Sequence, residues 1–396
     1  MLTGRGVFGG RDSLKTLIWL AIAAASLGFA GPIAAEPPSL AAETTRTIDA
    51  IFADFNRPDT PGYAIGVVQN GRLIFARGYG EANLDDGIAI TPQTVFHIAS
   101  LSKQFTAAAL ALLILDGRVS LDDPVARFIP EAAKYGPGLE VKHLVYMTSG
   151  LPDYGTIPRS NGDPWFSAFY FTRDDAIRAS LSSPKLDWPP GSRRAYSKAN
   201  YMLITRIVEQ ASGKPFGEVL QERIFAPLGM TSTHLDDDTT AIVAHRAVGY
   251  APRSAEIVAA ANKVGFTLRA GPGYARMIRN SPHFGGSGVM TNLEDLARWD
   301  ANWTSAKVGG PAFVALMQKR IKFQHDKDND AFGLVFGTYK GRTTIWYSGE
   351  DLDASSYMAR FPDRNVTVFC LSNMLTGDCE GRGEKVMDAL VAAGRV

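Results

Sequence analysis

Two residues that could exchange a proton, Ser100 and Lys103, stand three positions apart at the start of an apolar stretch. No proline or glycine interrupts the chain from Ser102 to Asp116, and alanine and leucine dominate it, so the sequence predicts a helix there. Residues three apart share one face of a helix, roughly 5–6 Å from each other. Apolar neighbours disfavour the charged form of a lysine. A neutral Lys103 would then take the proton of the Ser100 hydroxyl and make it a nucleophile.

The spacing alone is a weak indication of chemistry. Ser182 and Lys185 have the same spacing, but Pro184 stands between them and prevents a helix of this kind. A serine at the start of a helix is also often only a cap. His97 precedes Ser100 by three residues, and we expect it to pack, because as a base it would crowd the hydroxyl. No Gly-x-Ser-x-Gly motif occurs, which argues against an α/β-hydrolase.

The first 35 residues are expected to be an export signal. Three basic residues precede an apolar stretch at 17–30, which has the length of a signal-peptide core and is short for a membrane span. Small residues at 33–35 then offer a cleavage point, the alternative being an uncleaved anchor. Both interpretations predict that the remaining chain, 36–396, is periplasmic or secreted, with no membrane contact beyond the signal.

Charge and cysteine content exclude two classes of protein. The signal holds three of the 41 basic and one of the 40 acidic residues, which leaves 38 basic and 39 acidic residues in the body. A nucleic-acid-binding surface would need a basic excess, so no nucleic-acid partner is expected. Cys370 and Cys379 are too few for a cysteine-based zinc site, and they either form a disulfide or remain packed thiols. No metal-binding or phosphate-binding motif occurs.

The elements that must position Ser100 predict an α+β fold. Tyr63–Val68 and Arg72–Arg77 flank Asn70-Gly71, a strong hairpin cue. Two hairpins near the C-terminus are expected from strands at 333–339, 343–347, 355–361 and 365–372. Helices are expected at 47–55, 141–147, 173–179, 199–211, 216–225, 293–303 and 384–393, and another after the acidic segment 121–124.

This order predicts one antiparallel sheet built from both ends of the chain and flanked by helices. The expected α/β lobe comprises residues 40–138 and 284–396, and a mostly helical lobe, 139–283, is inserted into it.

Several short segments occur in an order and at separations that are typical of one superfamily. They are Phe96–Thr106, Leu144–Leu151, Pro190–Tyr201, Ala226–Met230 and Gly286–Trp299. Together they resemble the nucleophile motif, the "LLTHTSGL" segment, the tyrosine motif, the "PLGM" segment and the region after the insertion in serine β-lactamases and penicillin-binding-protein-like enzymes. The resemblance is to the branch of class C β-lactamases, D,D-peptidases and esterases, and it covers nearly the whole chain after the signal.

The resemblance implies an acyl-enzyme mechanism without metal or organic cofactor, acting on a small-molecule acyl substrate. Ser100 would attack a carbonyl, and Lys103 and Tyr196 would share the work of the general base. By position, the third motif of the family is Tyr347-Ser348-Gly349 on a strand edge. The backbone N–H groups of Ser100 and Glu350 would then form the oxyanion hole. Nothing in the sequence indicates the oligomeric state.

Two departures from the family pattern bear on the substrate. Lys198 stands where the tyrosine motif usually has asparagine, and Asn200, two residues further, would face elsewhere. Tyr347 replaces the lysine or histidine that helps bind a substrate carboxylate. Lys198 either restores a positive charge to the pocket from another wall or points to solvent.

Two functions of different classes remain open. The first is an exported serine hydrolase acting on carboxylic esters or related acyl substrates, with β-lactamase or D,D-peptidase activity as the variant that the departures disfavour. The second is a catalytically impaired relative that binds peptidoglycan fragments or a protein partner without turnover.

Overall fold

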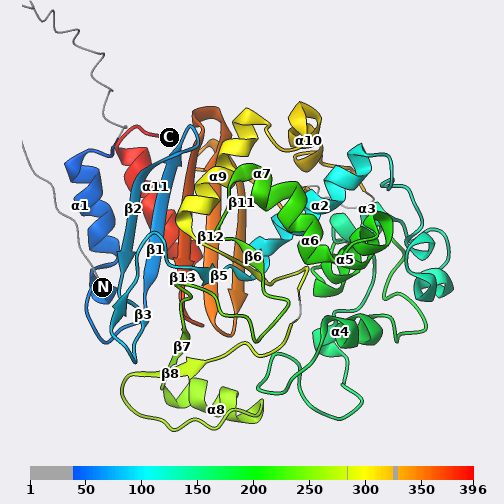
Figure 1. The fold of residues 1–396 in the computed structure, drawn as a ribbon, viewed down its shortest axis with the longest axis horizontal. Coiled ribbons are helices and arrows are strands. Elements are labelled where there is room, and N and C mark those ends of the chain that lie inside the picture. The colour runs from blue at the N-terminus through cyan, green and yellow to red at the C-terminus, as the bar shows by residue number, and fades with distance from the viewer. Residues whose placement is uncertain (1–38, 283, 324–328) are drawn as a thin grey trace, which may run out of the picture. The chain divides into compact units, whose positions relative to one another are not determined.

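A six-stranded antiparallel sheet joins the two ends of the chain, as the sequence predicts (Figure 1). The computed structural model describes residues 39–282, 284–323 and 329–396, so the expected export signal lies outside the described residues. The strand order is β10-β11-β12-β13-β1-β2, and β1 pairs with β13 along its whole length. The strands are β1 (Tyr63–Gln69), β2 (Arg72–Tyr79), β10 (Val335–Tyr339), β11 (Arg342–Asp351), β12 (Ala354–Phe361) and β13 (Val366–Ser372).

Helices cover both faces of this sheet (Figure 1). On one face, α1 (Ala42–Ile51) and α11 (Cys379–Ala392) pack over Ile65 and Val67 of β1. On the other face lie α9 (Leu293–Ser305) and α2 (Lys103–Leu115), and the core there includes Ala64 and Val68 of the same strand. Successive side chains of a strand point to opposite faces. This alternation explains why β1 is buried over almost its entire length.

Helix α2 runs through the interior rather than over the surface. All of its residues from Lys103 to Leu113 are buried, and it packs against α5 of the inserted segment. The inserted helices are α3 (Val141–Val145), α4 (Arg173–Ser180), α5 (Lys198–Ser212), α6 (Phe216–Leu220), α7 (Ala226–Leu228) and α8 (Ala255–Lys263), and a turn of π-helix spans Gln221–Phe225. Because α2 and α5 share one core, the insertion is continuous with the part that holds Ser100.

Short elements that the sequence did not indicate complete the fold. Three small sheets pair β3 (Glu81–Asn83) with β4 (Ile88–Ala89), β5 (Phe96–His97) and β6 (His234–Leu235) with β9 (Val289–Thr291), and β7 (Gly249–Pro252) with β8 (Tyr274–Met277). Helix α10 spans Gly310–Met317.

The helix expected after residues 121–124 is wrong. The chain there forms only 3₁₀ turns, at Val125–Arg127 and Pro130–Tyr135. Pro130 has no N–H to donate, and it disfavours helical backbone at Ile129, which is accordingly not helical.

The two cysteines come together between β13 and α11. The sulfurs of Cys370 and Cys379 lie 2.7 Å apart, both side chains are buried, and both are free cysteines in this structure. Within the described ranges, no helix is both long enough and apolar enough to cross a membrane. The same ranges contain no cluster of three or more histidine, cysteine or acidic side chains suited to a metal ion.

Candidate active site

Ser100 lies on a 3₁₀ turn, Ala99–Ser102, that leads into α2. The sequence placed it on the α-helix itself, but that helix begins at Lys103. In a 3₁₀ turn residues three apart are eclipsed, so the turn aligns the Ser100 and Lys103 side chains more closely than an α-helix would. Ala99 has a φ of +45°, a backbone conformation that residues other than glycine rarely adopt. Such strain often occurs beside reactive groups.

Three polar atoms form a closed triangle at this turn. Lys103 Nζ lies 2.9 Å from Ser100 Oγ and 2.7 Å from the Tyr196 hydroxyl, and the two oxygens are 2.8 Å apart. Tyr196 comes from the loop that precedes α5, and it keeps 42% of its surface exposed. A proton can therefore pass between any two of these groups directly, without a bridging water.

The environment lowers the pKa of both candidate bases. Lys103 is completely buried, and this burial is the main cause that lowers its pKa, against the opposing effect of Tyr196. Burial by itself would raise the pKa of the Tyr196 phenol, but the positive charge of Lys103 and hydrogen bonds from Lys103 and Ser100 bring it below the usual value. Lys198 lowers the pKa of both groups further. The pair therefore titrates as a unit that loses a proton more readily than either group would alone.

A backbone carbonyl holds the Lys103 amine in place. Lys103 Nζ donates to the carbonyl oxygen of Gly286, 2.6 Å away, in the turn that precedes β9. Thr106, one turn further along α2, donates to the neighbouring Gly285 carbonyl at 2.7 Å. These two bonds fix the start of α2 against residues almost two hundred positions later in the chain.

Strand β11 brings the third motif beside Ser100. Only Arg342–Trp346 of this strand pair with β10, so Tyr347–Asp351 extend past that neighbour. Gly349 lies directly against the turn, because a Cβ atom at this position would stand 2.7 Å from the backbone nitrogen of Ser100. Glycine is required for so close an approach. Glu350, whose N–H is the second expected oxyanion donor, follows immediately.

The other expected pocket residues lie around the same hydroxyl. Lys198 lines the cavities on both sides of Ser100, and its Nζ stands 4.0 Å from the centre of the Phe166 ring, so it turns to the pocket rather than to solvent. Tyr347, only 8% exposed, lines one cavity with Ser348, and burial raises the pKa of its phenol well above the usual value. Asn200 is buried and bonded to Ser149, away from this site.

Two cavities meet at Ser100. The first, which we call the apolar pocket, has a volume of about 220 Å³. Its wall is mainly apolar and carries two carboxylates; besides Ser100 and Lys198 it is lined by Tyr154, Phe166, Met202, Phe284, Gly286, Ser287, Glu350, Asp351, Leu352 and Leu375. The second, the open cleft, has a volume of about 350 Å³ and is lined by the Tyr347–Glu350 strand segment, Tyr196 and Arg194. The guanidinium of Arg194 makes a bidentate ion pair with Asp330, at 2.5 and 2.9 Å.

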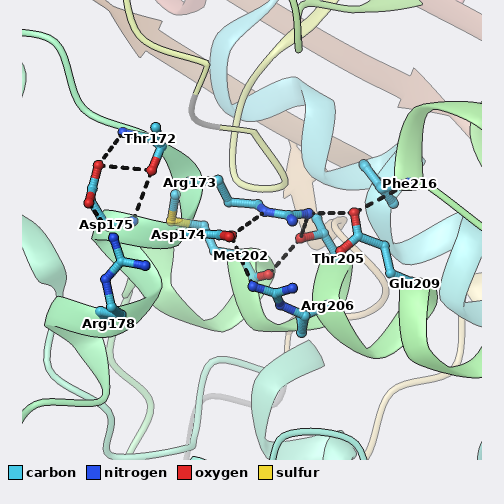
Figure 2. Close-up of polar contacts among 10 residues, drawn as sticks. All are labelled: Thr172, Arg173, Asp174, Asp175, Arg178, Met202, Thr205, Arg206, Glu209 and Phe216. Carbon is cyan, nitrogen blue, oxygen red and sulfur yellow. Dashed lines mark hydrogen bonds and ion pairs between the residues drawn. The ribbon is translucent and has the colours of Figure 1, made fainter.

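Phe284 of the apolar pocket packs against the side chain of Arg173. The guanidinium of Arg173 lies over its ring, 4.7 Å from the centre. Figure 2 shows the cluster that holds this arginine between α4 and α5: Arg173 Nη1 lies 2.7 Å from Glu209 and 3.2 Å from Thr205. Sequence reasoning missed Arg173 and the apolar lining, since most of those residues lie in loops, where no periodicity marks them.

Comparison with known proteins agrees with this architecture. The family model described as Beta-lactamase matches residues 48–392. A D-aminopeptidase of Gluconobacter oxydans is 29% identical over 66% of this chain and 45% of its own length. Protein flp of Staphylococcus aureus is 25% identical over 84% of this chain and 64% of its own length. The chain thus spans about half to two thirds of these curated relatives.

A solved structure shows the same fold. The D-amino acid amidase of Ochrobactrum anthropi SV3, crystallised with D-phenylalanine, superposes with a TM-score of 0.74 over 88% of this chain and 99% of its own, at 22% identity. The expected α+β architecture is confirmed by this likeness. Because the family model spans almost every described element, the chain belongs to the Beta-lactamase family.

Proposed function

We propose that this protein is a serine hydrolase that cleaves carboxylic esters or related acyl compounds through an acyl-enzyme on Ser100. The observation that carries the proposal is the closed triangle of Ser100, Lys103 and Tyr196, with all three distances below 3 Å. A hydroxyl in contact with two groups of lowered pKa is the arrangement expected of an activated nucleophile.

The reaction follows from this geometry. The Ser100 oxygen bonds to the substrate carbonyl carbon while its proton passes to the Lys103–Tyr196 pair. The negative oxygen that forms would be stabilised by the N–H groups of Ser100 and Glu350, each worth roughly 3–4 kcal/mol. The pair returns the proton to the leaving group as its bond to carbon breaks. Water then attacks the ester carbon on Ser100, and the same pair takes its proton. The pair passes this proton to the Ser100 oxygen as the bond from that oxygen to carbon breaks, which releases the acid.

The lining of the apolar pocket favours a particular acyl group. Aromatic and aliphatic side chains such as Phe166 and Phe284 suit an apolar substituent, and Glu350 and Asp351 would attract a positive charge. Relatives named D-aminopeptidase and D-amino acid amidase point to the amide of an amino acid with a free amino group as a second substrate class. Both classes require the same acyl-enzyme.

The strand wall of the open cleft lacks the lysine or histidine that would bind the carboxylate of a β-lactam or a peptidoglycan stem, and the ammonium of Lys198, which also lines the cleft, lies over the Phe166 ring instead. Tyr347 supplies only a buried, neutral phenol there, and Arg194 is already paired with Asp330. We therefore expect a short-chain nitrophenyl ester to be hydrolysed faster than a chromogenic cephalosporin. A clear preference for the cephalosporin would contradict our interpretation of Tyr347.

Covalent labelling tests the proposal directly. A fluorophosphonate should modify the tryptic peptide 78–103, which carries Ser100, and Ser100→Ala should abolish this adduct and lower ester hydrolysis by roughly 10²–10³-fold or more, the effect of losing one oxyanion donor. Peptide mapping is needed, rather than total label, so that the modified serine is identified. A folded protein with no adduct on that peptide and no turnover would support the alternative, a relative that binds without catalysis.

A further inference from the structure

Ser287 presents a second hydroxyl to the apolar pocket, in a turn to which the mechanism above gives no chemistry. Its Oγ lies 2.8 Å from Nε2 of His97, and Nδ1 of the same ring lies 2.8 Å from Asp353. Serine, imidazole and carboxylate in this order activate a nucleophile in hydrolases of unrelated folds. The sequence argues against His97 as a base for Ser100. The structure places the His97 ring beside a different serine.

Hydrogen bonding around His97 determines which ring nitrogen can act as a base. The Gly288 N–H donates to Nε2 at 3.3 Å, so in the neutral ring Nε2 carries the lone pair and Nδ1 carries the proton. That proton is donated to Asp353. The lone pair on Nε2 therefore faces the Ser287 hydroxyl and can accept its proton.

One of the two carboxylates beside this pair favours the proton transfer. Asp353 contacts Nδ1 of the imidazole at 2.8 Å, and it stabilises the imidazolium that forms when the serine gives up its proton. The Ser287 hydroxyl also donates to Asp351 Oδ2 at 3.2 Å, so its proton must turn from this carboxylate to Nε2 before the transfer.

Only the serine of this group is accessible to a ligand. The side chains of His97 and Asp353 are 2% and 11% exposed, whereas Ser287 is half-buried and lines the pocket together with Ser100. The preceding residue, Gly286, accepts the hydrogen bond from Lys103. Ser287 is thus adjacent to the first nucleophile but has its own base.

We propose that Ser287 is a second nucleophile of the apolar pocket, served by His97 and Asp353, which accepts an acyl or phosphonyl group independently of Ser100. Its oxygen bonds to the electrophilic carbon or phosphorus, and the bond to the leaving group breaks. The serine proton passes to His97 Nε2 and from there to the leaving group. The proposal shares the pocket with the proposed function but does not depend on Lys103 or on the reactivity of Ser100.

The expected rate follows from the oxyanion donors. The N–H groups of Ser100 and Glu350 are the oxyanion donors expected for attack by Ser100, so we expect Ser287 to react without their help. The loss of one such donor slows acyl transfer by roughly 10²–10³-fold. Labelling of Ser287 is therefore expected to be slower than that of Ser100 by at least this factor.

The test uses the Ser100→Ala variant and a fluorophosphonate, which loses fluoride as the serine oxygen bonds to phosphorus. Mass spectrometry should find the adduct on tryptic peptide 280–298, which carries Ser287 and is distinct from the Ser100 peptide. Adding Ser287→Ala should abolish this adduct. Adding Asp353→Asn should slow it by roughly 10⁴-fold, the effect of the same change in a serine–histidine–aspartate triad.

Ser192 provides the matched control, because its hydroxyl donates to the Pro189 carbonyl and has no imidazole partner among the residues that the structure describes. Ser192→Ala in the Ser100→Ala background should leave labelling of peptide 280–298 unchanged. The proposal is overturned if a folded Ser100→Ala protein gives no adduct on that peptide, or if Asp353→Asn and His97→Gln leave the rate of its formation unaltered. An adduct on peptide 78–103 of the unchanged protein, together with no adduct on peptide 280–298 of the Ser100→Ala variant, would support the proposed function while removing this one.

Discussion

Lys103 is a side chain whose position is unfavourable for stability and favourable for reaction. It has no exposed surface, and its nitrogen contacts three oxygens, those of Ser100, Tyr196 and Gly286. Burial favours the neutral amine, whereas three oxygen partners favour the ammonium. The balance between these effects keeps its pKa below the usual value of a lysine. At the residue scale, the site therefore depends on how each neighbour shifts this balance.

Replacing Tyr196 with phenylalanine should reduce kcat/KM by roughly 10²–10⁴-fold, the usual contribution of a general base. It should also move the acid limb of the pH profile to lower pH. Tyr196 raises the pKa of Lys103, so without the phenol the amine loses its proton at lower pH. Steady-state kinetics from pH 4 to 10 would measure both effects. Tyr201→Phe removes a buried phenol that donates to the Val145 carbonyl, and as a control it should leave the pH profile in place.

Lys198 should act on the same profile with the opposite sign. Its charge lowers the pKa of both Lys103 and Tyr196, so Lys198→Met should raise both and move the acid limb of kcat/KM to higher pH. Lys198→Arg keeps the charge and should preserve the limb. If the methionine variant has the profile of the unchanged protein, Lys198 does not tune the pair. A loss confined to substrates with a carboxylate would instead indicate direct substrate binding.

At the scale of elements, the site depends on how closely strand β11 approaches the turn that carries Ser100. Ser356 of β12 donates to the Ile98 carbonyl at 2.7 Å, which ties the next strand to the same turn. Gly349 lies between these groups. The sequence indicates this glycine through the family motif, but the reason for it lies in a contact between segments about 250 positions apart.

Gly349→Ala should separate the strand from the turn. The added Cβ would stand 2.6–2.9 Å from Ser356 Oγ, the Ser100 nitrogen and the Ile98 carbonyl oxygen, so a backbone shift is unavoidable. We expect a loss of about 1–3 kcal/mol in the free energy of unfolding. We also expect kcat to fall with little change in KM, since the expected oxyanion donors, the N–H groups of Ser100 and Glu350, would move apart. Gly138→Ala is the matched control, because no described residue would lie within 4 Å of the added Cβ. An active, fully stable Gly349→Ala protein would contradict this packing argument.

At the scale of the whole molecule, one buried ion pair joins a helix to the central sheet. Arg360 of β12 contacts Asp300 of α9 at 2.6 Å, and Thr367 of β13 donates to the same carboxylate at 2.5 Å. Both charged side chains are almost completely buried. Burial raises the pKa of Asp300 although Arg360 opposes this effect. Removing one partner of such a pair is costly, because the other charge stays buried.

Arg360→Met should lower the free energy of unfolding by roughly 3–5 kcal/mol at neutral pH. The loss should shrink on acidification. The raised pKa of Asp300 means that the folded protein binds a proton more readily than the unfolded chain, so its contribution to stability is greatest at low pH and is lost as pH rises. Urea unfolding at several pH values between 4 and 8 measures this dependence. Arg364→Met, at an exposed position of the same hairpin, should have little effect at any pH.

The sequence predicted the elements and motifs that are encoded by residues close together in the chain. Alternating strands and the Asn70-Gly71 turn located the sheet, and ordered motifs located Ser100, Lys103 and Tyr196. Periodicity could not reveal the partners of His97, because Ser287 and Asp353 are 190 and 256 positions away. Nor could it place Ser100 on a 3₁₀ turn, since the apolar pattern of α2 continues across the boundary.

The walls of the apolar pocket differ in kind from the lysine beside it that contacts Ser100. Phe166, Phe284, Leu352 and Leu375 all stand in turns or irregular segments, whereas Lys103 begins a helix with no free face. Evolution, natural or in the laboratory, can therefore exchange the first set with less disturbance of the scaffold than residues of α2 would cause. A library randomised at those four positions should yield new substrate preferences, and one randomised along α2 should yield mainly unfolded protein.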